Sequence, residues 1–516
     1  MFTKHLTLII MLCILIFALW NHQVQSEEHD LSFPYQTYRD GDFFFPPYES
    51  ESERIGVGKS SNHDMTPLQA GWYLDWMSQN DHTDPNGMAY IQTIYFYSPD
   101  SWDDVLDKCR TTTQVSQISF TPDGQELIKR IKNNPGALWQ VGNEPDSYYN
   151  GTPMTPELYA EMYHHFYTII KETDPLAKVT VGGIVQPSPI RLDYLDAVLN
   201  HYQATYGEPF PIDLWNIHFY IFLEGECFNS EHTSWGATVP PPNTSNSNGW
   251  VIEFSAEDML RLIPSDDKPS MEGNLRAFRQ WMFDRGYKDK PLIITEYGIL
   301  PRSDYDGFEN EVASQFMIDT MNMFLTLTDS TTGLQSDGGR LLQMWAWFST
   351  NHDSYGGNLF NADGSLTPVG ETFIQQTTNR ITPYVDLQIV PSQRSHASLN
   401  NRMSVDAFIT NQGNTISGDG VVRITLTDVM TPSIQFTEDI SIGSLNARYQ
   451  DNYTTYISKT WMFEPPYAYT ITITANPDQT ITETNHANNM LSYVFRGYFQ
   501  QSPQHTRRVI LSYLCA

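Results

Sequence analysis

Two short apolar runs, far apart in the chain, each end on a glutamate, and this pairing constrains the fold more than any other feature. The first reads Leu-Trp-Gln-Val-Gly-Asn-Glu-Pro-Asp over residues 138–146, and the second reads Pro-Leu-Ile-Ile-Thr-Glu-Tyr-Gly over residues 291–298. Each run has the length and composition of a buried parallel strand. Pro145 cannot continue a strand ladder, so Asn143 and Glu144 fall at the carboxyl end of the first strand. In sheets and barrels of alternating strands and helices, reactive groups gather at that end.

Residues 55–380 alternate strand-like runs with amphipathic helix patterns. One helix is expected to begin at Thr155-Pro156, and another to run from Glu272 to Arg285 and stop at Gly286. The expected strands are 55–58, 71–76, 90–96, 137–144, 179–184, 214–220, 292–296 and 341–347. Eight strands, each followed by a helix, predict an α/β fold of the (β/α)8 TIM barrel type.

The pattern changes after Pro383. Residues 384–495 show strands of alternating apolar and polar residues, separated by turns rich in Asn, Gly and Asp, with no helix pattern between them. This part of the chain predicts an all-β, immunoglobulin-like sandwich. The tail, residues 496–516, fits neither part, and its role stays open.

The first 26 residues carry an apolar run from Leu6 to Trp20. The run is too short for a comfortable membrane span and has the length of a signal-peptide core, so we expect residues 1–26 to be a signal peptide; the alternative is an uncleaved anchor. Residues 27–54 predict a flexible lead-in. The protein is therefore expected to be secreted or extracellular, with association to the cell surface as a further option.

Charge and cysteine content exclude several classes of function. The chain holds 60 acidic against 30 basic residues, a net charge of -30, which would repel phosphate backbones, so nucleic acid is excluded as a partner. Cys13, Cys109, Cys227 and Cys515 have no metal-site spacing and do not make a disulfide framework, although one bridge can form. We expect no cofactor and no metal.

Two glutamates at the mouth of one barrel are the minimal apparatus for cleaving a glycosidic bond. A retaining hydrolase needs one carboxyl to donate a proton and a second, about 5 to 5.5 Å away, to attack the anomeric carbon. Strands four and seven of a barrel face each other across its mouth, and the expected strands place Glu144 on the fourth and Glu296 on the seventh. A polysaccharide is therefore the expected substrate.

Asn143-Glu144-Pro145 and Ile294-Thr-Glu296-Tyr-Gly298 resemble the motifs of clan A of the glycoside hydrolases. The resemblance implies that Glu144 is the acid/base and Glu296 the nucleophile, and that Asn143 binds the sugar 2-hydroxyl. His218-Phe-Tyr220 is similar to the clan's His-x-Tyr, whose Tyr holds the nucleophile. Trp345 or Trp347 is placed like its sugar-stacking platform. Trp72, Trp76 and Trp139 are expected in the barrel core or behind the site.

The chain departs from the clan at the second strand. Many members carry an Arg there that pairs with the nucleophile, whereas residues 71–76 offer Asp75 and no Arg. The Trp-Tyr-x-x-Trp strand, followed by Val-Gly-Asn-Glu-Pro-Asp, is most similar to the fungal and bacterial endo-β-1,3-glucanase branch. A long polar insertion, residues 223–270, is expected to wall the substrate cleft.

The sandwich resembles the bacterial cell-adhesion-related domain, CARDB. Asn411-Gln-Gly413 and the run Thr-Ile-Thr-Glu-Thr-Asn-His-Ala-Asn-Asn over residues 480–489 carry this match. It implies an attachment or spacing module, for a cell surface or a glycan.

Three functions remain open at this stage. The first is a secreted retaining glycoside hydrolase that cleaves a β-linked polysaccharide by double displacement. The second is a non-catalytic carbohydrate-binding or adhesion protein on the same scaffold, which the missing Arg and the adhesion-like domain favour. The third is a transglycosylase with the same residues. The sugar, the linkage and the choice between endo and exo action are not determined by these motifs.

Overall fold

The computed structural model describes most of the two predicted parts of the chain. The expected signal peptide, all four cysteines, most of the 223–270 insertion and nearly all of the tail lie outside the described residues. The described ranges are 40–80, 87–97, 118–147, 154–222, 256–265, 268–353, 355–391, 397–398, 402–448, 450–463 and 467–497.

Eight parallel strands form a closed barrel in the first part of the chain. They are β1 (Ile55–Gly58), β2 (Trp72–Leu74), β3 (Ala89–Tyr97), β5 (Leu138–Val141), β6 (Lys178–Val181), β7 (Trp215–His218), β8 (Leu292–Tyr297) and β9 (Met344–Phe348). They pair in the order β6-β5-β3-β2-β1-β9-β8-β7, and the short β4 (Ser119–Thr121) runs antiparallel beside β3. Ile184, just past β6, bridges in parallel to Ile217 of β7 and closes the ring. The predicted barrel is confirmed.

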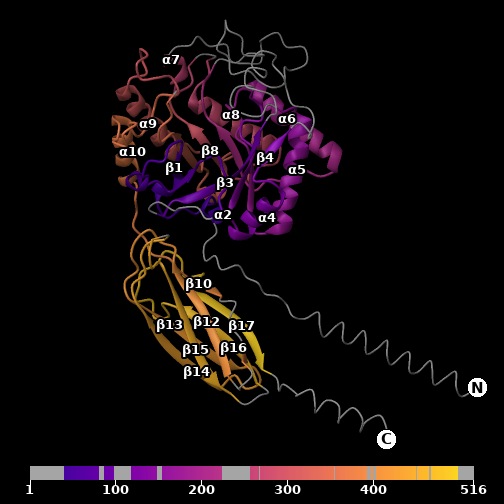
Figure 1. The fold of residues 1–516 in the computed structure, drawn as a ribbon, viewed down its shortest axis with the longest axis vertical. Helices are drawn as coiled ribbons and strands as arrows, with labels where there is room; N and C mark the ends of the chain where they lie inside the picture. The colour runs from indigo at the N-terminus through magenta and orange to yellow at the C-terminus, as the bar shows by residue number, and fades with distance from the viewer. Residues whose placement is uncertain are drawn as a thin grey trace, which may run out of the picture.

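Helices surround the barrel (Figure 1). They are α4 (Gly124–Asn133), α5 (Pro156–Thr173), α6 (Pro189–Tyr206), α8 (Met271–Asp284), α9 (Asn310–Thr326) and α10 (Pro368–Thr378), with shorter helices at α2 (Asp40–Phe43) and α7 (Ala256–Met259). Thr155 caps α5 as expected, because its hydroxyl oxygen accepts the Leu158 N–H at 3.3 Å. Among the described residues, no helix is both long and apolar enough to cross a membrane.

The expectation of a helix after every strand is wrong for the first strand. β1 is followed only by the 3-10 turn η2 (Thr66–Leu68) before β2 begins. The connection is short, has Pro67 at its centre and lacks a helical spacing of apolar residues, so it cannot form a full crossover helix.

The barrel interior is filled at its amino-terminal end, and the segment before β1 closes that end. Phe44 is fully buried and its ring lies edge-on to Trp72, with the centroids 5.4 Å apart. The expectation of a flexible lead-in over residues 27–54 is therefore wrong for its described part, which packs against the barrel because its aromatic residues seal the interior.

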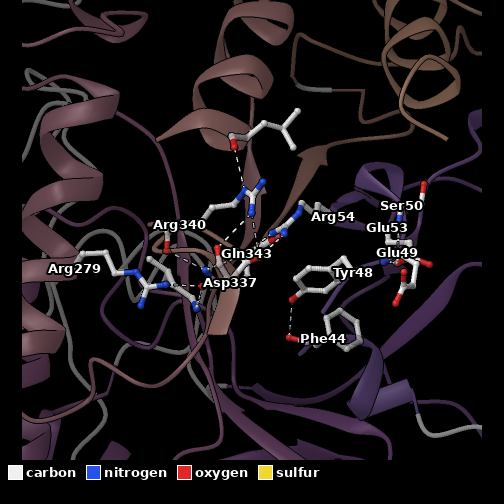
Figure 2. A network of polar contacts seen from close by, with 12 residues as sticks. Phe44, Tyr48, Glu49, Ser50, Glu53, Arg54, Arg279, Asp337, Arg340 and Gln343 are labelled. Atoms are coloured by element: carbon white, nitrogen blue, oxygen red, sulfur yellow. Dashed lines mark hydrogen bonds and ion pairs between the residues drawn. The ribbon is translucent and has the colours of Figure 1, made fainter. Parts of the chain in front are cut away.

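A network of polar contacts, drawn in Figure 2, ties this end of the barrel together. The Arg54 guanidinium donates to both carboxylate oxygens of Asp337, at 2.8 and 2.5 Å, and to the Gln343 carbonyl oxygen at 3.0 Å. Arg279 donates to the Gln343 side chain at 2.5 Å. Arg54 and Asp337 are almost fully buried, and the bidentate geometry meets the requirement that buried charges be paired.

The second part of the chain is a sandwich of two antiparallel sheets. One sheet holds β10 (Leu387–Pro391), β11 (Ala397–Ser398), β12 (Arg402–Asn411) and β15 (Thr454–Met462); the other holds β14 (Gln435–Ile442), β13 (Gly420–Asp428), β16 (Tyr467–Ala475) and β17 (Met490–Gly497). Alternate residues of β13, such as Val422, Ile424 and Leu426, are buried between the sheets. The predicted sandwich is confirmed.

The sandwich lies against the amino-terminal end of the barrel, on the side away from α7 (Figure 1). Arg448 of the sandwich donates to the Glu53 carboxylate at 3.0 Å and to the Gly87 carbonyl oxygen at 3.2 Å. The Tyr384 hydroxyl donates to the same carboxylate at 2.5 Å. Glu53 lies two residues before β1 and Gly87 two residues before β3, so these contacts are made where the strands begin.

We predict that Arg448→Ala destabilises the protein by about 3 kcal/mol, because it leaves the buried Glu53 carboxylate without its cation. Denaturant unfolding followed by tryptophan fluorescence measures the loss. Arg423→Ala is the matched control: Arg423 pairs with Asp439 and Asp478 on the exposed face of the same sandwich, and its removal should leave the midpoint almost unchanged. Equal effects of both substitutions would contradict this account of the contact.

Candidate active site

Glu144 stands just past the end of β5 in a backbone conformation that few residues adopt. Its φ is +44°, and its N–H donates to the Gly183 carbonyl oxygen at 3.0 Å. This approach of the β5 and β6 ends requires glycine: a Cβ on Gly182 would lie 2.6 Å from the Gly142 carbonyl carbon. A left-handed conformation at a non-glycine residue costs of order 1 to 3 kcal/mol and is common at functional sites.

Glu296 faces the barrel interior because β8 is irregular at this point. Ile294 pairs with Ile217 of β7, but His218 pairs with Glu296, so β8 carries one extra residue. The Thr295 hydroxyl donates to the Asn216 side chain at 2.9 Å, and Asn216 in turn donates to Gln140 at 3.1 Å. A bulge of this kind re-aims a side chain. Here it directs Glu296 toward His218.

His218 lies between the two glutamates and is fully buried. Its Nδ1 is 2.8 Å from Glu144 Oε1, and its Nε2 is 3.3 Å from Glu296 Oε1. The ring fits because position 183 is glycine: a Cβ there would lie 2.4 Å from the imidazole. The ligand atoms of Glu144, His218 and Glu296 all lie within 4.8 Å of one another, so the two carboxylates predicted from the sequence do meet.

The same three residues are the group of the described chain best placed to hold a metal ion, since they offer one nitrogen and two carboxylate ligands. Two of the candidate ligand atoms are already engaged, however. Glu144 Oε1 contacts His218, and Glu296 Oε1 accepts a hydrogen bond from Trp76. Glu144 Oε2 and His218 Nε2, in contrast, are buried and have no hydrogen-bond partner within the described part of the chain.

Trp76, which was expected in the barrel core or behind the site, contacts one of the two carboxylates. Its indole Nε1 donates to Glu296 Oε1 at 2.6 Å. The sequence shows only that Trp76 lies two residues beyond Leu74, and residues two apart on a strand point to the same face. The structure adds that Leu74 faces inward. It belongs to the barrel-interior cluster, which consists of Phe43, Phe44, Trp72, Leu74, Ala89, Ile91, Leu138, Leu214, Ile293, Met344 and Ala346. The Trp76 φ of +57° departs from strand geometry, and no sequence pattern indicates that.

Burial dominates the ionisation of the site. It raises the pKa of Glu296 above the usual glutamate range, with the nearby Glu144 adding to the rise; the His218 charge and the Trp76 hydrogen bond act in the opposite direction. For His218 the largest influence is burial, which lowers its pKa, but the surrounding carboxylates outweigh it and the net pKa is raised. The carboxylates therefore favour the protonated imidazole, against the effect of burial.

Two tyrosines border the carboxylates. Burial, followed by the Glu296 and Glu144 charges, raises the pKa of Tyr220 well above its ordinary value. Burial, followed by Glu144, raises the pKa of Tyr95 to about 12. Both therefore remain protonated hydroxyls at neutral pH. Tyr220 was predicted from the sequence, whereas Tyr95 was not. Asn143, beside Glu144, is partly exposed and lies 3.4 Å from the Gln140 amide nitrogen.

The structure does not bring Trp345 and Trp347 to the site. Along β9, Met344 and Ala346 belong to the barrel-interior cluster, so the residues between them face outward. Trp345 packs on Phe324 of α9, and Trp347 packs edge-on to Tyr297. Both indoles are fully buried. The β9 residue at the mouth is Phe348, whose ring lies 5.5 Å from that of Trp76.

Comparisons with solved structures give several barrel proteins at low identity. A GH128 (subgroup VII) oligosaccharide-binding protein from Trichoderma gamsii is 12% identical over 65% of this chain and 97% of its own, with a TM-score of 0.36. A glucosidase from Croceicoccus marinus is 9% identical over 81% and 95%, with a TM-score of 0.39. β-Glucuronidase 2 of Bacteroides uniformis is 13% identical over 89% and 47%, with a TM-score of 0.36. No curated protein matches the chain.

All these TM-scores are below 0.5. The sandwich, in contrast, is assigned to a family by its sequence. Residues 384–493 match the CARDB family model. The chain therefore consists of a parallel eight-stranded barrel followed by a C-terminal CARDB domain.

Proposed function

We propose that this protein is a secreted retaining glycoside hydrolase that cleaves a β-linked polysaccharide. The observation that carries the proposal is the approach of the Glu144 and Glu296 carboxylate oxygens to within 4.8 Å at the mouth of the barrel. Retaining enzymes hold their two carboxyl groups about 5 to 5.5 Å apart, while inverting enzymes leave about 6.5 to 9.5 Å for a water molecule. The short separation supports attack by a carboxylate rather than by water.

In the first step, the Glu296 carboxylate attacks the anomeric carbon and forms an ester bond to it. The bond from that carbon to the leaving oxygen breaks, and Glu144 gives its proton to this oxygen. In the second step, Glu144 takes a proton from water, whose oxygen attacks the anomeric carbon and releases Glu296. The hydroxyls of Tyr220 and Tyr95 stay protonated and border the carboxylates throughout, and Asn143, the neighbour of Glu144, contacts the sugar.

A binding protein on the same scaffold is the second candidate function. The observation that favours it is the raised pKa of Glu296, since a protonated Glu296 cannot attack. A screen of purified protein on β-glucans, mannans and xylans separates the two. Release of reducing sugar with retained configuration supports the hydrolase. Retention of a glycan without any release supports the binding protein.

We expect Glu296→Ala to lower kcat by at least about 10⁴-fold, because the covalent intermediate can no longer form. Added azide should restore turnover and give a glycosyl azide of inverted configuration, measured by NMR of the product. Glu257→Ala, at an exposed position on α7, is the control and should keep full activity. Undiminished turnover in Glu296→Ala would exclude Glu296 as the nucleophile.

Glu144→Gln should lower activity by different amounts on substrates with different leaving groups. A sugar leaving group needs the Glu144 proton, so polysaccharide cleavage is expected to fall by about 10²- to 10⁴-fold. An aryl glycoside whose phenol leaves without a proton should lose far less in its first step. Rapid-mixing kinetics of aryl release measures this difference. Equal losses on both substrates would mean that Glu144 is not the acid.

A further inference from the structure

We propose that Trp76 is a positioning residue for Glu296 and that it holds this carboxylate through a neutral hydrogen bond, which leaves His218 as the cation that the two glutamates share. The effect on catalysis rests on the proposed hydrolase function, whereas the effect on the carboxylate itself does not.

The contact between Trp76 and Glu296 is short and the indole is held in place. Nε1 lies 2.6 Å from Glu296 Oε1. The ring packs edge-on to Phe348, with an interplanar angle of 61°, and lies so close to Gly58 that a Cβ there would be 2.9 Å from it. A donor fixed on both sides restricts the carboxylate to one orientation, which a nucleophile needs for attack.

The charges around Glu296 explain why a neutral donor matters. Within the described part of the chain, the ion-pairing cation within 4 Å of either glutamate is His218, and no Lys or Arg takes that place. The nearby Arg191 forms an ion pair with Asp146 at 2.5 Å, and both side chains are fully buried. The groups that face Glu296 come from four strands of the barrel. They are Trp76 just after β2, Tyr95 in β3, Glu144 just after β5, His218 at the end of β7 and Tyr220 just after it.

His218 is therefore the cationic partner that the two glutamates have in common in this buried part of the described chain. A guanidinium in the place of Trp76 would stabilise the ionised Glu296 and lower its pKa by about 1 to 3 units. The indole N–H stabilises the same carboxylate more weakly, so burial and Glu144 keep the pKa of Glu296 high. Because the nucleophile must be ionised, activity should fall as the pH drops through this raised pKa.

Two substitutions at this position should move the Glu296 titration in opposite directions. Trp76→Phe keeps a ring but removes the donor, so the pKa should rise, by about one unit. Trp76→Arg adds a cation, so the pKa should fall. The titration is followed by carbon NMR of glutamate labelled at its carboxyl carbon, with the Glu296 signal identified by its loss in Glu296→Gln. This measurement needs no substrate.

Trp281→Phe is the matched control. The Trp281 indole on α8 donates to the Asp196 carboxylate at 3.0 Å, outside the site, so its loss should alter stability but leave the Glu296 signal in place. In Trp76→Phe we further expect kcat/KM to fall by about 10- to 100-fold and its acid limb to move to higher pH. Should Trp76→Phe not fold, Trp76→Arg and Trp76→His, which keeps a ring N–H, provide the same comparison.

An unchanged Glu296 titration in Trp76→Phe, or an equal shift in Trp281→Phe, would overturn the inference. If the NMR shifts occur as expected while the wild-type protein cleaves none of the glycans tested, the inference holds and the hydrolase proposal fails. The two failures are thereby distinguished.

Discussion

The imidazole of His218, held between two buried carboxylates, is the interaction on which the site depends. Two ionised glutamates within 4.8 Å of each other repel strongly where water is excluded. The imidazole contacts one carboxylate oxygen of each, at 2.8 and 3.3 Å, and offsets that repulsion. Double displacement requires one carboxyl to hold a proton while the other is ionised, and the short distance between the two carboxylates favours that division.

This arrangement needs unusual backbone at several points, and the barrel supplies the support. Glu144 and Trp76 both have positive φ, and β8 carries a bulge beside Glu296. Behind Glu144, the buried Asp146–Arg191 pair ties the loop after β5 to α6. Local strain of this kind persists only where the surrounding packing holds it in place. The glycines at 182 and 183 leave the space in which the strand ends and the imidazole come together.

The amino-terminal end of the barrel carries the contacts that join its segments to each other and to the sandwich. There the Arg54–Asp337 pair joins β1 to the segment before β9, and Arg448 joins the sandwich to Glu53. The CARDB domain thus contacts the end where strands begin, away from Glu144 and Glu296.

The sequence by itself determined the barrel, the sandwich and the two glutamates, because strand periodicity, helix signals and Asn-Glu-Pro are local properties that burial and backbone chemistry impose on neighbouring residues. It also indicated His218 and Tyr220, through the resemblance of His218-Phe-Tyr220 to a motif of clan A of the glycoside hydrolases. Only the tertiary structure decided the rest. The β8 bulge is a relation between two strands, so no single segment encodes it. Trp345 and Trp347 point outward because Met344 and Ala346, which alternate with them along β9, face the barrel interior. The hydrogen bond from Trp76 to Glu296 depends on a left-handed conformation at residue 76 that its neighbours impose, and that is why this contact could not be predicted from the chain alone.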